Sequence, residues 1–172
     1  RMCSFCNIQK ARPLPVDGDE PKRVAQAVGQ LGLKHVVITS VTRDDLSDGG
    51  AGIFAQTVKR IREKLPQVKI EILIPDFGFS LDALKTVAEA KPDIIAHNLE
   101  TVPSLYKQVR QGANYLGSLN LLRMINKMSS GSKIKSGLML GLGENQDEVL
   151  SVMKDLRSVG CDFLSIGQYL SP

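Results

Sequence analysis

Residues 69–100 read "KIEILIPDFGFSLDALKTVAEAKPDIIAHNLE" and contain one complete strand–helix–strand unit. Two short apolar runs, 69–75 and 93–100, flank an amphipathic segment that begins at Ser80. Runs rich in Ile and Leu are typical of strands buried on both faces, as in parallel sheets. Serine is a favoured residue immediately before a helix, so Ser80 is the expected N-cap. The stretch therefore predicts two parallel strands joined by a helix.

The same alternation recurs along the 172 residues. Further apolar runs occupy 35–41, 134–142 and 163–170, and helical patterns occupy 21–33, 53–65, 118–128 and 147–159. Gly32 and Gly160 stand where helices should stop. This order predicts an α/β domain with a mainly parallel sheet. A full eight-unit barrel needs about 250 residues, so the sheet is either open or a partial barrel.

Composition predicts one globular domain over residues 1–172, because 42% hydrophobic and 23% charged residues are ordinary values. No apolar run approaches the roughly 20 residues that span a bilayer, so we expect no membrane segment. The net charge of +4 comes from scattered Lys and Arg, without a basic stripe interleaved with aromatic residues. Nucleic-acid binding is therefore not expected, whereas an acidic protein partner would suit the surface. Three cysteines, an odd number, favour a reducing compartment over a disulfide scaffold.

Polar and glycine-rich segments follow all five apolar runs, at the strand ends where α/β folds collect their sites. This distribution favours an enzyme with an enclosed ligand. In "TSVTRDDLSDGG", the acids Asp44, Asp45 and Asp48 fit either a capped loop before a helix near Ile53 or a cation site. The sequence leaves both interpretations open.

Asn98 and Glu100 should project from the same face of a strand, because residues two apart share a face. Two polar groups near a buried strand end are costly without partners, which favours ligand contact over an internal hydrogen-bond network. His97 should share the opposite face with Leu99 and serve packing. Lys135 is either buried and paired or exposed at its strand start.

Cys3 and Cys6 form a CxxC pair within the first six residues of the chain. Zinc needs about four ligands, and the chain adds only one further cysteine and two histidines: Cys161, His35 and His97. A thioredoxin-like redox pair needs a following helix, which two nearby prolines oppose. A chance pair, a loose metal site and an iron–sulfur cluster with a ligand upstream of Arg1 all remain open. Cys161 is expected to be a small core residue.

Several short motifs, taken together and in their order along the chain, indicate a protein family. These are "RMCSFC" with "ARP", "VVITSVTRDDLSDGGA", "PDF", "HNLETVPSLYKQVR", "KSGLMLGLGE" and "GQYLSP". Together they resemble the lipoyl synthases, a family of radical S-adenosylmethionine enzymes. The resemblance implies a partial (β/α)6 barrel that lacks its first strand, in a chain truncated at both ends. The family motif is CxxxCxxC; Cys3 and Cys6 match its second and third cysteines, and the first is expected upstream of Arg1.

The resemblance also implies the cofactors. A 4Fe–4S cluster would be held by Cys3, Cys6 and the upstream cysteine. S-adenosylmethionine would be bound by Ser40, Asn98, Glu100, Lys135, Gly141 and Gln168. No side chain is expected to act as a catalytic acid or nucleophile, since the cofactors carry the chemistry. The ligands of the family's auxiliary 4Fe–4S cluster lie outside this chain, and Cys161 matches none of them.

The implied activity is the radical insertion of two sulfur atoms into the octanoyl chain of a lipoyl-carrier protein. The implied partners are the glycine cleavage H protein or E2 lipoyl domains, with ferredoxin or flavodoxin as electron donor. The expected compartment is the bacterial cytoplasm, with mitochondrion and plastid as alternatives. Competing interpretations are a radical S-adenosylmethionine enzyme with another substrate, and a zinc or redox CxxC module on an α/β scaffold.

Overall fold

A computed structural model describes residues 2–8, 11, 13–129 and 131–171. Its centre is a five-stranded sheet in the order β2-β3-β4-β6-β7, in which every neighbouring pair is parallel. The strands are β2 (His35–Thr39), β3 (Lys69–Leu73), β4 (Ile94–Ala96), β6 (Lys133–Leu140) and β7 (Phe163–Gln168). The predicted α/β fold with a parallel sheet is therefore confirmed, and the sheet is a partial barrel.

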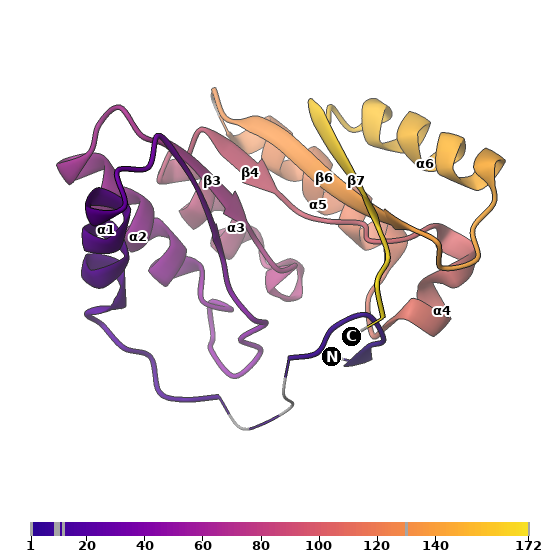
Figure 1. The fold of residues 1–172 in the computed structure, drawn as a ribbon, viewed down its shortest axis with the longest axis horizontal. Coiled ribbons are helices and arrows are strands. Elements are labelled where there is room, and N and C mark those ends of the chain that lie inside the picture. Colours follow the sequence, from indigo (N-terminus) through magenta and orange to yellow (C-terminus); the bar gives the residue numbers. More distant parts are fainter. Residues whose placement is uncertain (1, 9–10, 12, 130, 172) are drawn as a thin grey trace.

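The predicted helices are all present and line one side of the sheet (Figure 1). They are α1 (Glu20–Gln30), α2 (Ala51–Lys64), α3 (Leu81–Glu89), α5 (Tyr115–Met128) and α6 (Gln146–Ser158). The helix expected near Ile53 begins two residues earlier, and Ser80 caps α3 as expected by accepting from the Ala83 N–H at 3.3 Å. Among the described residues, no helix has the length and apolar character needed to cross a membrane.

The core fills the space between the sheet and these helices. Strand residues such as Ile70, Ile72 and Ile134 are fully buried and pack with helix residues such as Ile61 and Leu122. Alternate residues on the same strands point to the other, concave face. The outer face of the sheet is therefore the apolar one, and the inner face is free to carry polar side chains.

The start of the chain is tied to a short segment after β4. The first two described residues, β1 (Met2–Cys3), pair antiparallel with β5 (Arg110–Gln111), so that Cys3 lies opposite Arg110. The Ser4 N–H adds a hydrogen bond to the Val109 carbonyl at 2.9 Å. β5 follows the short 3-10 helix η2 (Pro103–Leu105) and helix α4 (Tyr106–Val109). Another 3-10 turn, η1 (Phe77–Phe79), follows β3.

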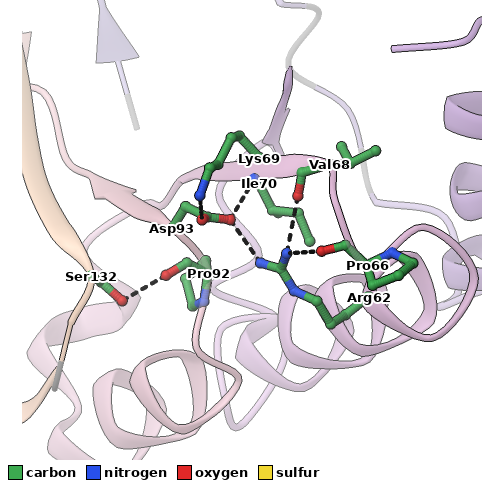
Figure 2. Close-up of polar contacts among 8 residues, drawn as sticks. All are labelled: Arg62, Pro66, Val68, Lys69, Ile70, Pro92, Asp93 and Ser132. Carbon is green, nitrogen blue, oxygen red and sulfur yellow. Dashed lines mark hydrogen bonds and ion pairs between the residues drawn. The ribbon is translucent and has the colours of Figure 1, made fainter. Parts of the chain in front are cut away.

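Asp93 fastens the amino-terminal ends of β3 and β4 to α2 (Figure 2). Its carboxylate accepts hydrogen bonds from Arg62 at 2.7 Å, Lys69 at 2.8 Å and the Ile70 N–H at 3.0 Å. Arg62 also donates to the carbonyls of Pro66 and Val68, at 3.1 and 3.0 Å. Burial by itself would raise the pKa of Asp93, but these donors and the charge of Arg62 lower it to about 2.

Asp93→Asn should lower the free energy of unfolding at pH 7 by about 1–3 kcal/mol, because charged hydrogen bonds at a partly buried site are lost. The pKa of Asp93 is about 2 in the fold against an ordinary 3.8, so its stabilisation is complete above pH 3.8 and disappears as pH falls through 2. Urea unfolding over that range should therefore show the wild type and variant converging. Glu63→Gln, in the exposed Arg60–Glu63 pair, is the control and should change stability by less than about 1 kcal/mol. Equal effects of the two substitutions would contradict the assignment.

Candidate functional site

The concave face of the sheet contains a cavity of about 300 Å³. Its walls come from β2, β3, β4, β6, β7 and the residues just after β4. The lining residues are Val37, Glu71, Leu73, Ala96, Asn98, Glu100, Lys135, Gly137, Leu138, Met139, Ser165 and Gly167. Most occupy alternate positions along their strands, which is the pattern expected for one face of a pleated sheet.

Asn98 and Glu100 lie in this cavity, as their spacing predicted. The segment after β4 continues along β6: the Glu100 N–H donates to the Gly137 carbonyl at 2.9 Å, and the Glu100 carbonyl accepts from the Met139 N–H at 2.8 Å. Leu99 points oppositely and is fully buried in the core. His97 is buried too, with its ring nitrogens 3.0 Å from the Ile74 carbonyl and the Ser118 hydroxyl. The predicted division between cavity-facing and core-facing residues is confirmed.

Glu100 occupies an unfavourable backbone conformation. Its φ of 66° lies in the left-handed region, which costs a non-glycine residue about 1–3 kcal/mol. Burial raises the pKa of its carboxyl, while a hydrogen bond with the Asn98 side chain and the charge of Arg110 oppose that rise. A half-buried carboxylate on a strained backbone is a feature that clusters at functional sites.

Arg110 holds the backbone of the segment that carries Asn98 and Glu100. One of its guanidinium nitrogens, Nη1, donates to the carbonyls of Asn98 and Leu99 at 3.0 and 3.2 Å, and to the Tyr106 hydroxyl at 3.0 Å. The guanidinium lies 5.4 Å from the centre of the Tyr106 ring, within the range of a cation–π contact. The Tyr106 hydroxyl itself donates to the Leu99 carbonyl at 2.9 Å. The backbone that presents Asn98 and Glu100 is thereby held by two side chains.

Gly137 leaves the space that the Asn98 side chain occupies. A β-carbon at position 137 would lie 2.7 Å from Asn98 Oδ1, well inside contact distance. Gly167 lines the same cavity, but a β-carbon there would meet nothing within 4 Å. The glycine in "KSGLML" is therefore explained by the close approach of one side chain.

Lys135 also lies in the cavity and forms an ion pair with Glu71, Nζ to Oε1 at 2.8 Å. Of the two alternatives for Lys135, the paired one applies, although the side chain is only partly buried. Sequence analysis missed Glu71. The signal was available, because an acid in the middle of the apolar run 69–75 must face either solvent or a polar interior.

The other three predicted cofactor residues are not among those that line the cavity. Ser40 is exposed just after β2, where its hydroxyl donates to the Val41 carbonyl at 2.9 Å. The N–H of Gly141 donates to Glu144 at 2.6 Å in the turn after β6. Gln168 is exposed at the last position of β7. All three lie at the carboxyl ends of strands, near the rim of the sheet.

Cys3 is partly buried and Cys6 is exposed, on a turn closed by a hydrogen bond from the Cys6 N–H to the Cys3 carbonyl at 3.3 Å. Within the part of the chain that the structure describes, no three His, Cys, Asp or Glu residues converge as a metal site. Cys161 is buried in the core, its thiol 3.1 Å from the Phe163 carbonyl, and burial raises its pKa.

The acidic loop after β2 is occupied by internal contacts. Asp48 accepts from the N–H groups of Gly50 and Gly52 at 2.9 and 2.8 Å, at the start of α2. Asp45 forms a two-pronged ion pair with Arg43, both contacts at 2.8 Å. These contacts favour the capped-loop interpretation over a cation site.

Comparison with known proteins identifies the family. The model of the radical SAM superfamily matches residues 1–156, and the chain belongs to this superfamily. It is 55% identical over 172 residues to a lipoyl synthase of Caldanaerobacter subterraneus subsp. tengcongensis, covering all of this chain and 60% of that protein. It is 58% identical over 173 residues to a lipoyl synthase of Trichlorobacter lovleyi, covering all of this chain and 61% of that protein. The chain thus spans about three fifths of the length of the curated relatives it matches.

Solved structures support the fold. Methylornithine synthase (PylB) superposes with a TM-score of 0.75 at 18% identity, over 98% of this chain and 49% of that one. HydG, a maturase of the [FeFe]-hydrogenase, gives a TM-score of 0.76 at 13% identity, over 98% and 39% of the two chains. The superfamily uses a 4Fe–4S cluster and S-adenosylmethionine, and membership sets aside the zinc or redox-module alternative.

Gly137→Ala should displace the Asn98 side chain and lower the free energy of unfolding by about 1–3 kcal/mol, the usual cost of overpacking. Gly167→Ala is the matched control, and it should change neither the position of the Asn98 side chain nor the free energy of unfolding. Chemical denaturation gives the stabilities, and the side-chain amide resonance of Asn98 reports its position by NMR. An unmoved Asn98 in Gly137→Ala would refute the packing argument.

Proposed function

We propose that this chain is the cofactor-binding barrel of a lipoyl synthase, which inserts two sulfur atoms into an octanoyl chain carried by a lipoyl-carrier protein. The observation that carries the proposal is the 54–58% identity to lipoyl synthases along the whole chain. H protein and E2 lipoyl domains are the proposed carriers, ferredoxin or flavodoxin is the proposed electron donor, and the bacterial cytoplasm is the proposed compartment.

The described residues fit the cluster that the superfamily uses. Cys3 and Cys6 present two sulfurs from one turn, and a cluster of this kind requires thiolate ligands. We propose that they hold the cluster together with a cysteine upstream of Arg1. The pairing of Cys3 with Arg110 connects this turn to the segment that carries Asn98 and Glu100.

We propose that Asn98 and Glu100, at the rim of the cavity, bind the ribose of S-adenosylmethionine. The Glu100 carboxylate can accept hydrogen bonds from the two ribose hydroxyls, and the Asn98 amide can both donate and accept. Ser40, Gly141 and Gln168 remain proposed contacts at the rim. The Lys135 ammonium group forms its ion pair with Glu71, deeper in the cavity than Asn98.

The cluster and S-adenosylmethionine, when bound, supply the radical that removes hydrogen from unactivated carbon. The side chains of this barrel bind, orient and screen, and none acts as a catalytic acid or nucleophile. Glu100 and Asn98 would fix the nucleoside, and Arg110 and Tyr106 hold the backbone that presents them. The auxiliary cluster that donates sulfur is proposed to lie in the remainder of the full-length protein.

The full-length protein, reconstituted anaerobically with iron and sulfide, should convert an octanoylated carrier into its lipoyl form, with two sulfur atoms gained by mass spectrometry. Cys6→Ala should abolish this conversion and the formation of 5′-deoxyadenosine, because the cluster loses a thiolate ligand. Formation of 5′-deoxyadenosine without sulfur insertion by the wild type would favour the runner-up, a radical S-adenosylmethionine enzyme with another substrate.

Cys161→Ala is the matched control for that experiment. It removes a thiol that lies in the core, so iron content and turnover should persist at a cost of roughly 1 kcal/mol in stability. Full iron content and turnover in Cys6→Ala, or loss of iron in Cys161→Ala, would show that the cluster ligands are assigned to the wrong residues.

Glu100→Ala should weaken S-adenosylmethionine binding by roughly 10- to 100-fold, the value of a charge-assisted hydrogen bond. Calorimetry on reconstituted protein measures the affinity, and unchanged iron content shows that the cluster survives. Because burial raises the pKa of Glu100, wild-type affinity should fall as pH drops through that raised pKa, and the affinity of Glu100→Gln should not. Glu89→Ala, on the exposed Lys85–Glu89 pair, is the control. If Glu100→Ala bound S-adenosylmethionine as tightly as the wild type but bound the carrier more weakly, Glu100 would instead be a contact for the substrate.

A further inference from the structure

The floor of the cavity carries a charged pair that the proposed cofactor contacts leave unexplained. We use "floor" for Glu71 and Lys135, which lie toward the amino-terminal ends of the strands. The strand register places Lys135 beside Ala96, and Asn98 lies two residues further toward the rim. Glu71 pairs with Ile94, one inward-facing position below Leu73 on the same strand. The cavity therefore has polar groups at two levels, the rim and the floor.

The floor has unused hydrogen-bonding capacity. Glu71 is 3% exposed, and among the described residues its Oε2 receives no hydrogen bond. The His35 ring lies beside Oε2, with Nε2 at 3.6 Å, which is beyond hydrogen-bonding distance. Lys135 has three N–H donors, and Glu71 Oε1 is the acceptor for one of them. A buried carboxylate oxygen without a donor is costly, so this end of the cavity is suited to water or to a polar ligand group.

The wall beside the floor is apolar: the strand register places Val37 level with Glu71, and Leu73 and Ala96 level with Lys135. Val37, Leu73 and Ala96 line it from three neighbouring strands, and Met139 contributes from β6. An alkyl chain can pack against such a wall and gain from each methylene that leaves water. The same chain gains nothing from the floor.

This inference rests on the proposed function, in which the acyl chain is attached to a carrier protein. A folded carrier cannot enter a cavity of about 300 Å³, so the free methyl end of the chain must lead inward. We propose that the Glu71–Lys135 ion pair is the stop that sets acyl-chain length, and so determines specificity for the octanoyl group. A longer chain would strip water from the ion pair, which costs more than two further methylenes gain.

The test uses full-length reconstituted protein and carrier-derived peptides that bear octanoyl-, decanoyl- or ω-hydroxydecanoyl-lysine, with affinity measured by calorimetry. Decanoyl should bind wild type about tenfold or more weakly than octanoyl, and ω-hydroxydecanoyl should recover about tenfold by donating to Glu71 Oε2. These arms need no variant, so they hold even if a substituted floor fails to fold. Equal octanoyl and decanoyl affinities, or no gain from the hydroxyl, would overturn the proposal.

Glu71→Ala/Lys135→Ala removes both charges together, since removing one would leave the other buried and unpaired. Decanoyl should then bind within about threefold of octanoyl. Val37→Ala is the matched control. Val37 is the strand neighbour of Glu71, so this substitution enlarges the cavity beside the ion pair and leaves both charges in place. The variant should still bind decanoyl more weakly than octanoyl. Unchanged discrimination in the double variant would overturn the proposal while octanoyl sulfuration, and with it the proposed function, stands. If the wild type cannot sulfurate the octanoyl peptide, the proposed function and this inference fail together.

Discussion

The contact on which the two proposed cofactor regions depend is the hydrogen bonding of Arg110 to the backbone after β4. Its guanidinium donates to the carbonyls of Asn98 and Leu99 and stacks on Tyr106, while its own backbone pairs with Cys3. One residue thus connects the cysteine turn at the start of the chain with the carboxylate at the cavity rim. Charged hydrogen bonds at a partly buried site are among the stronger ones in proteins. This connection would keep the proposed cluster site and the proposed nucleoside site next to each other.

A second constraint comes from the sheet itself. The outer face is covered by helices and must be apolar, so polar groups that serve a ligand are confined to alternate residues on the inner face. Glu71, Lys135, Asn98 and Glu100 all obey this rule. Gly137 extends it, because the inner face can hold the Asn98 amide only where the neighbouring strand has no β-carbon. Fold and site are therefore specified by the same alternation.

This explains what could be predicted from the sequence. Five apolar runs and their helices are periodic patterns, and the strands, the helices and the opposite orientation of Asn98 and Leu99 followed from them. The pairing of β1 with β5 could not be predicted, since each is two residues long and shows no periodicity. The positive φ of Glu100 has no signal in residue type. The Glu71–Lys135 pair joins residues 64 apart along the chain, on strands separated by β4, so only the assembled sheet reveals it.

The most direct test is a crystal structure of the full-length protein with its iron–sulfur cluster and S-adenosylmethionine bound. The ribose hydroxyls should lie within hydrogen-bonding distance of the Glu100 carboxylate, with the sulfurs of Cys3 and Cys6 bound to iron and Arg110 still on the Asn98 carbonyl. A nucleoside bound away from Glu100, or iron bound by residues other than Cys3 and Cys6, would contradict the site described here.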